Sequence, residues 1–157
     1  METLSPPSTC WHDTIRIATQ RPTEFIDLTD CLASLLAASE IRFGFVNVQS
    51  RHTTTAIVVN EHEPLLLADF ATLLEQAAPR DAVYRHDDAA VRTVNLTADE
   101  RVNGHAHCRA LLLGNSACVN VIDGALCLGT WQRVFLVELD GPREREISVV
   151  VLGGCAR

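Results

Sequence analysis

Apolar and polar residues follow a pattern along this chain that predicts mostly β-strands. Residues 14–17 alternate polar and apolar side chains, which is typical of a half-buried strand, and residues 44–60 form two β-rich arms around a polar segment. Further strands are expected at 117–122, 125–129, 132–139 and 147–152. Asp123-Gly124 is a strong two-residue hairpin signal, so the first two of these late strands should pair directly.

Three helices are expected between the strands. The first follows Asp27, a capping residue; the second begins at Pro64 and ends before Pro79; the third runs from near Asn103 to Gly114. One face of the first helix collects Leu28, Leu32, Leu35 and Leu36. The buried face of the second helix is expected to comprise Leu66, Phe70, Leu73, Leu74 and Ala77.

Together these elements predict an α+β fold with antiparallel β-sheets packed against about three α-helices. Residues 1–11 are expected to form a flexible tail, and residues 12–157 a single domain. Residues 80–102 are polar and irregular, and we expect a long loop there. Long loops in compact domains are often functional.

The composition of the chain argues against several classes of function. The chain has 157 residues and a net charge of −7, which argues against a nucleic-acid binder because phosphate contacts require a basic surface. No apolar run approaches the length that spans a bilayer, and no secretory signal is visible, so a cytoplasmic protein is expected. The six cysteines are scattered and predict reduced, mostly buried thiols.

Histidines in polar settings are the candidates for chemistry. His52 lies in RHTTT, His86 precedes Asp87 in the long loop, and His105 and His107 lie at the start of the third helix. Because His105 and His107 are two positions apart on a helix, at most one of them should face a common site. A carboxylate such as Asp87 can fix the tautomer of an adjacent imidazole. Taken one at a time, His52 and the His86 cluster also fit solvated surface groups.

Other polar residues stand where they could line a site. Arg109, with the free N–H groups of a helix start, could bind an anion. Gln132, after Trp131, heads a buried apolar run and needs partners for its amide. Asn60 ends a strand, and His62 is read as a surface residue. No zincin, P-loop or dinucleotide spacing is present.

Taken together, the motifs resemble those of the YjbQ family, also called UPF0047. The matching segments are RHTTTAIVVNEHEP (51–64), YRHDD (84–88), NGHAHCRALLLGNS (103–116) and DGALCLGTWQRVFLVELDGPRER (123–145). The resemblance implies a homotrimer and a shared pocket built around His52, His86 and His107. It places Asn60 and Gln132 near that pocket, and it puts Arg109 where many members have Lys.

The resemblance also implies a function. Some family members are described as secondary thiamine-phosphate synthases, which join a pyrimidine diphosphate to a thiazole phosphate. His52, His86, His107 and Gln132 would then be catalytic, with Arg109, Asn60 and Trp131 binding the phosphorylated metabolite. The three histidines could also hold a divalent metal, Zn²⁺ or Mg²⁺. The alternatives are a metal-dependent hydrolase of a small ester or phosphate, and a trimer that binds a metal or an anionic metabolite without turnover.

Overall fold

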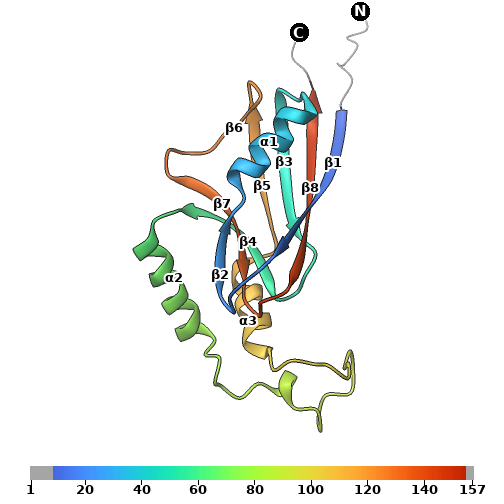
Figure 1. Cartoon of the computed structure of the whole chain (residues 1–157), viewed down its shortest axis with the longest axis vertical. Helices are drawn as coiled ribbons and strands as arrows, with labels where there is room; N and C mark the ends of the chain where they lie inside the picture. The colour runs from blue at the N-terminus through green and yellow to red at the C-terminus, as the bar shows by residue number, and fades with distance from the viewer. Residues whose placement is uncertain (1–8, 155–157) are drawn as a thin grey trace, which may run out of the picture.

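Two antiparallel sheets form the body of the protein in a computed structural model that describes residues 9–154 (Figure 1). The five-stranded sheet, in the order β1-β8-β3-β5-β6, comprises β1 Thr9–Ala18, β8 Glu144–Gly154, β3 Phe43–Ser50, β5 Ser116–Ile122 and β6 Ala125–Leu126. The three-stranded sheet, in the order β2-β7-β4, comprises β2 Glu24–Asp27, β7 Gln132–Glu138 and β4 Thr55–Glu61. The helices are α1 Thr29–Ser39, α2 Pro64–Ala77 and α3 Gly104–Leu113, with a short 3₁₀ turn, η1 Arg85–Asp87.

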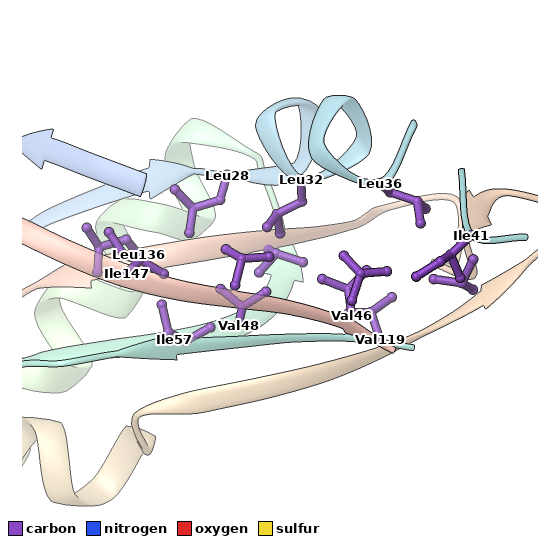
Figure 2. Close-up of a cluster of buried hydrophobic side chains, with 14 residues drawn as sticks. Leu28, Leu32, Leu36, Ile41, Val46, Val48, Ile57, Val119, Leu136 and Ile147 are labelled. Atoms are coloured by element: carbon purple, nitrogen blue, oxygen red, sulfur yellow. The ribbon is translucent and has the colours of Figure 1, made fainter. Parts of the chain in front are cut away.

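The main core lies between the two sheets and α1. Leu32 and Leu36 of α1 face inward in the same cluster as Val46 and Val48 of β3, as Figure 2 shows. Strand geometry explains this packing, because every second residue of β3 and β8 points to the same side. The inward set on β8 is Ile147, Val149 and Val151.

Strand β7 is buried on both faces because the main core covers one face of it and a second apolar cluster covers the other. Val134 and Leu136 join the main core, whereas Phe135 and Val137 enter a second cluster beneath α2 and α3. This arrangement accounts for the continuous apolar run, which a half-exposed strand would not contain.

Most of the predicted elements are confirmed, including the α+β class, the three helices and the hairpin at Asp123-Gly124. The hairpin joins β5 to β6, and both turn residues have positive φ, 53° and 78°. Strand β2 was missed, because four residues with two acidic side chains give little β signal. The predicted tail ends too late, since Thr9 to Trp11 already pair with β8; residues 1–8 lie outside the described part.

Two predictions of burial are wrong. Helix α2 has a single buried residue, Leu74, and Leu73 is 60% exposed. Only a narrow face of this helix, around Leu74, packs on the smaller sheet. The five described cysteines are free, but all are exposed; Cys155 lies outside the described residues. Among residues 9–154, no helix is both long and apolar enough to cross a membrane.

A buried ion pair joins the two sheets where β7 leads into β8. The guanidinium of Arg145 donates to both carboxylate oxygens of Glu138 at 2.6 Å, and both side chains are at most 3% exposed. The same carboxylate accepts the backbone N–H groups of Leu139 and Asp140 and the hydroxyl of Thr19. Burial works against the charge, but these donors, led by Arg145, lower the pKa of Glu138.

Replacing Glu138 with Gln should therefore destabilise the protein by about 3–5 kcal/mol, because Arg145 would remain buried without a countercharge. Urea unfolding followed by circular dichroism measures the effect. Arg16→Gln is the control: it breaks the exposed Arg16–Glu146 pair and should cost less than about 1 kcal/mol. Equal losses in the two variants would contradict a dominant role for the buried pair.

Candidate functional site

One polar cavity of about 450 Å³ lies where the long loop, the start of α3 and the ends of β3 and β8 meet. We call it the histidine cavity. Its charged and aromatic lining consists of three imidazoles, four guanidinium groups and one carboxylate: His52, His86, His107, Arg51, Arg92, Arg143, Arg145 and Glu100. The structure thus brings together three histidines from three separate segments of the sequence, the same three that the family resemblance assigns to one pocket.

His52 follows the end of β3 and is held by the backbone of β8. The amide N–H of Glu146 donates to its Nε2 at 2.8 Å. A neutral His52 must therefore carry its ring proton on Nδ1, since Nε2 is the acceptor. Burial, and then the charge of Arg145, lower the pKa of His52, so the ring is neutral at pH 7.

His86 and His107 lie against each other, with ring centroids 4.5 Å apart and planes at 61°. His86 comes from η1 and His107 from the first turns of α3. Burial, followed by the neighbouring His86, lowers the pKa of His107. Two imidazoles at this distance disfavour simultaneous protonation.

Asp87 fixes the two rings relative to each other through the backbone. Its Oδ1 accepts the N–H groups of Asn103 at 3.0 Å and Gly104 at 2.9 Å, which caps the start of α3. A side chain at Gly104 would collide with Tyr84, whose Cβ would lie 2.5 Å from the added Cβ. The carboxylate that follows His86 therefore caps a helix; no bond from it to an imidazole is present in the described residues.

Arg92 organises the long loop around His86. Its Nη1 lies 3.2 Å from Nε2 of His86 and 2.9 Å from Glu100, and its Nη2 donates to the carbonyl of Asn95. A guanidinium can only donate, so Nε2 of His86 is an acceptor and the ring proton of neutral His86 is on Nδ1.

Every arginine of the cavity has a carboxylate partner. The pairs, by closest N–O distance, are Arg51–Glu146 at 2.8 Å, Arg92–Glu100 at 2.9 Å, Arg143–Asp140 at 3.0 Å and Arg145–Glu138 at 2.6 Å. Each guanidinium has five N–H donors, so one carboxylate does not exhaust it. The cavity thus offers fixed donors for an anion without a large unpaired charge.

The residues do not fit the metal that the resemblance implies. A zinc ligand must present a nitrogen lone pair, but Nε2 of His52 and Nε2 of His86 accept N–H donors, which leaves protonated Nδ1 atoms. In the described part of the chain, no three His, Cys, Asp or Glu side chains are placed to hold a metal ion. The geometry of the described side chains therefore gives no support to the three-histidine centre for Zn²⁺ or Mg²⁺, which stays a prediction.

Arg109 does not line the cavity. It is 2% exposed, and it donates to the carbonyl of Ala78 at 2.9 Å and to Glu75. These bonds tie α3 to the end of α2. Its predicted role in phosphate binding is unsupported here, because its guanidinium is enclosed by the fold.

Asn60, Trp131 and Gln132 lie near the other end of the smaller sheet. Asn60 is five residues beyond Thr55 along β4, about 17 Å from the cavity end of that strand. The side chain of Gln132 accepts the N–H of Gly129 at 2.8 Å, and Trp131 is 70% exposed. Within one chain the structure does not bring these residues to the histidines.

His105 and His107 diverge as their spacing predicts. His105 is 1% exposed, both of its ring nitrogens lack partners within the described residues, and burial lowers its pKa. It is absent from the cavity lining. The four cavity arginines were missed by sequence reasoning; the only signal for them was the charge density of the long loop and of the Arg143–Arg145 turn.

A second hollow of about 370 Å³ adjoins the histidine cavity. The two share His52, Thr53 and His107, and the second continues over Ala110 and Leu111 of α3. A charged region therefore borders a more apolar one, with two imidazoles between them.

Comparisons with known proteins agree with this fold. The sequence pattern described as UPF0047 protein YjbQ-like matches residues 13–154. A UPF0047 protein of Methanothermobacter thermautotrophicus is 45% identical over 137 residues, covering 87% of this chain and 88% of its own length. One of Archaeoglobus fulgidus is 41% identical, covering 88% of this chain and 98% of its own.

Solved structures give the same result. A YbjQ-like protein of unknown function from Sulfolobus solfataricus superposes with a TM-score of 0.84 at 36% identity, covering 94% of this chain and 99% of its own. A YjbQ/UPF0047 protein from Clostridium acetobutylicum gives 0.77 at 30% identity, covering 88% and 98%. On the sequence match, the relatives and the shared fold, this chain belongs to the YjbQ (UPF0047) family.

Proposed function

We propose that the histidine cavity binds a small phosphorylated metabolite and that the protein is a transferase of the thiamine-phosphate-synthase type. The observation that carries the proposal is the convergence of four guanidinium groups and three imidazoles on one cavity of about 450 Å³. This volume lies within the range of small-molecule sites.

The hydrogen-bond directions favour an anion over a metal ion. The N–H of Glu146 and the guanidinium of Arg92 occupy Nε2 of His52 and of His86, which leaves each Nδ1–H as a donor. Donors fixed in advance stabilise phosphate oxygens without reorganisation during the reaction. Of the alternative functions, metal-dependent hydrolysis finds no set of three metal ligands among the described side chains, whereas binding of an anionic metabolite without turnover would use the same donors.

The transferase reaction requires donors of this kind. The C–O bond between the pyrimidine methylene carbon and the diphosphate breaks, and the electron pair leaves with pyrophosphate. The thiazole nitrogen then gives its lone pair to the methylene carbon, which forms the C–N bond. The arginines would hold the leaving pyrophosphate, and the apolar hollow over Ala110 and Leu111 would position a ring.

Replacing Arg143 with Met should weaken pyrophosphate binding about tenfold or more, because one charge-assisted donor is lost. Isothermal titration calorimetry in the presence of EDTA measures the affinity. Arg42→Met is the matched control, since Arg42 is an exposed arginine paired with Asp123 and absent from the cavity. Equal affinities of the two variants, or no pyrophosphate binding by the wild type, would reject the binding site.

The transferase itself is tested by thiamine phosphate formation from the two substrates. His107→Ala should abolish product while thermal unfolding shows an intact fold, and His12→Ala should leave the rate unchanged. Binding without product in the wild type would reject the transferase and retain the non-enzymatic binder.

Anion affinity should depend on pH in a defined direction. Burial lowers the pKa values of His52 and His107, so both rings are neutral at pH 7 and their protonation at acidic pH adds positive charge to the cavity. Sulfate keeps its charge over this range, and its affinity should rise about tenfold or more between pH 7 and pH 5. The double variant His52→Ala/His107→Ala should lose this rise. A sulfate affinity that decreases as the pH is lowered from 7 to 5, in wild-type protein that stays folded, would contradict the assignment.

We also propose that the chain assembles as a homotrimer, as the family resemblance implies. Exposed apolar side chains support contact between copies of the chain, since Leu111 is 84%, Leu112 66% and Trp131 70% exposed. Sedimentation equilibrium should give about three times the chain mass of 17.2 kDa. A monomer at micromolar concentration would reject the assembly.

A further inference from the structure

A second cavity, also of about 450 Å³, lies on the α2 side of the molecule. We call it the α2 cavity. Its walls come from β2, the residues just before it, and the first half of α2, and it shares no lining residue with the histidine cavity. Figure 1 shows α2 to the left of the sheets, apart from the loop that carries η1.

One side of the α2 cavity is apolar and the other is polar. Phe25, Leu67, Ala68 and Ala71 form the apolar side. This surface remains open because α2 packs on the smaller sheet through a single buried residue, Leu74. A flat apolar group would remove it from water.

His62 stands at the polar side, and its tautomer is fixed. Nδ1 of His62 lies 3.0 Å from Oδ2 of Asp27. Burial disfavours the charge of Asp27, but hydrogen bonds from Thr29, Arg133 and His62 lower its pKa to about 2. Asp27 is therefore a carboxylate at neutral pH and can only accept, so Nδ1 of His62 carries a proton and, in the neutral ring, Nε2 has the lone pair.

The imidazole is also fixed in position. Its ring meets Phe135 edge-on, with centroids 5.3 Å apart and planes at 76°. Asp27 in turn accepts from Nε of Arg133 at 2.7 Å and from the N–H of Thr29 at 2.9 Å. Among the described residues no hydrogen bond reaches Nε2 of His62, and the side chain is 46% exposed. A preorganised acceptor thus borders an apolar wall.

The charged side chains around the α2 cavity already have partners of opposite charge, which favours a neutral ligand over an ionic one. Arg133 neutralises Asp27. Glu24 accepts the backbone N–H of Gln20 at 2.7 Å and lies 3.8 Å from the guanidinium of Arg21. An ionic ligand would have to compete with these partners. A neutral hydrogen-bond donor can instead bind Nε2 of His62, which has no partner among the described residues.

We propose that the α2 cavity is a second ligand site, which binds a small neutral aromatic alcohol of the phenol class. The ring packs on Phe25, Leu67 and Ala68, and the hydroxyl donates to Nε2 of His62. The site is independent of the proposed transferase site, since the two cavities have no residue in common.

A pair of probes isolates the hydrogen bond. 4-Fluorophenol has the hydroxyl donor, and 4-fluoroanisole replaces it with a methyl ether of nearly the same shape. In ¹⁹F NMR titrations of the full chain, 4-fluorophenol should bind with a Kd on the order of 1 mM. The anisole should bind about tenfold more weakly, because its ether cannot donate to Nε2. Saturating pyrophosphate should change neither affinity.

His62→Phe should abolish the difference between the two probes while keeping an aromatic side chain at this position. His12→Phe is the control, since His12 lies outside the α2 cavity, and it should retain the difference. In the wild type labelled with ¹⁵N-histidine, the phenol should shift the unprotonated Nε2 resonance of His62. Equal affinities of the two probes, no binding of either, or a wild-type difference that survives in His62→Phe would overturn the proposal. So would a ¹⁵N shift confined to other histidines.

Discussion

The buried ion pair between Glu138 and Arg145 is the constraint on which the rest of the structure depends. It lies where the chain leaves the smaller sheet and enters the larger one, so it ties the end of β7 to the start of β8. Arg145 reaches from this pair into the histidine cavity and donates to Thr54 in the turn that carries His52. The next residue, Glu146, holds the ring of His52 through its N–H. A bond that joins the sheets therefore also sets one wall of the site.

The opposite wall depends on two residues of the long loop. Asp87 caps α3 and Arg92 binds His86, so the segment between α2 and α3 has a defined shape despite its few apolar side chains. Its polar composition follows from this role, because the loop is held by hydrogen bonds and ion pairs rather than by burial. The same contacts hold the ring of His86 against that of His107, although the two residues are distant along the chain.

The imidazoles of the two cavities have opposite hydrogen-bonding roles toward a ligand. In the histidine cavity, N–H donors occupy Nε2 of His52 and His86, which leaves protonated nitrogens suited to anions. In the α2 cavity, a carboxylate occupies Nδ1 of His62 and leaves an acceptor. The neighbour of each ring, which is set by the fold, decides whether the same side chain donates or accepts.

The sequence by itself determined the α+β class, the three helices, the hairpin and the family, because these depend on local periodicity, turn residues and contiguous motifs. It also separated His105 from His107, since helical spacing puts them on different faces. It could not show that Arg109 is enclosed between α2 and α3, that Asp87 caps a helix, or that α2 covers so little of its sheet. Only the tertiary structure decided the partner of each ionisable group, because those partners can lie 130 residues away along the chain, as for Arg16 and Glu146. Hydrogen-bond direction is a property of such pairs and of no single residue.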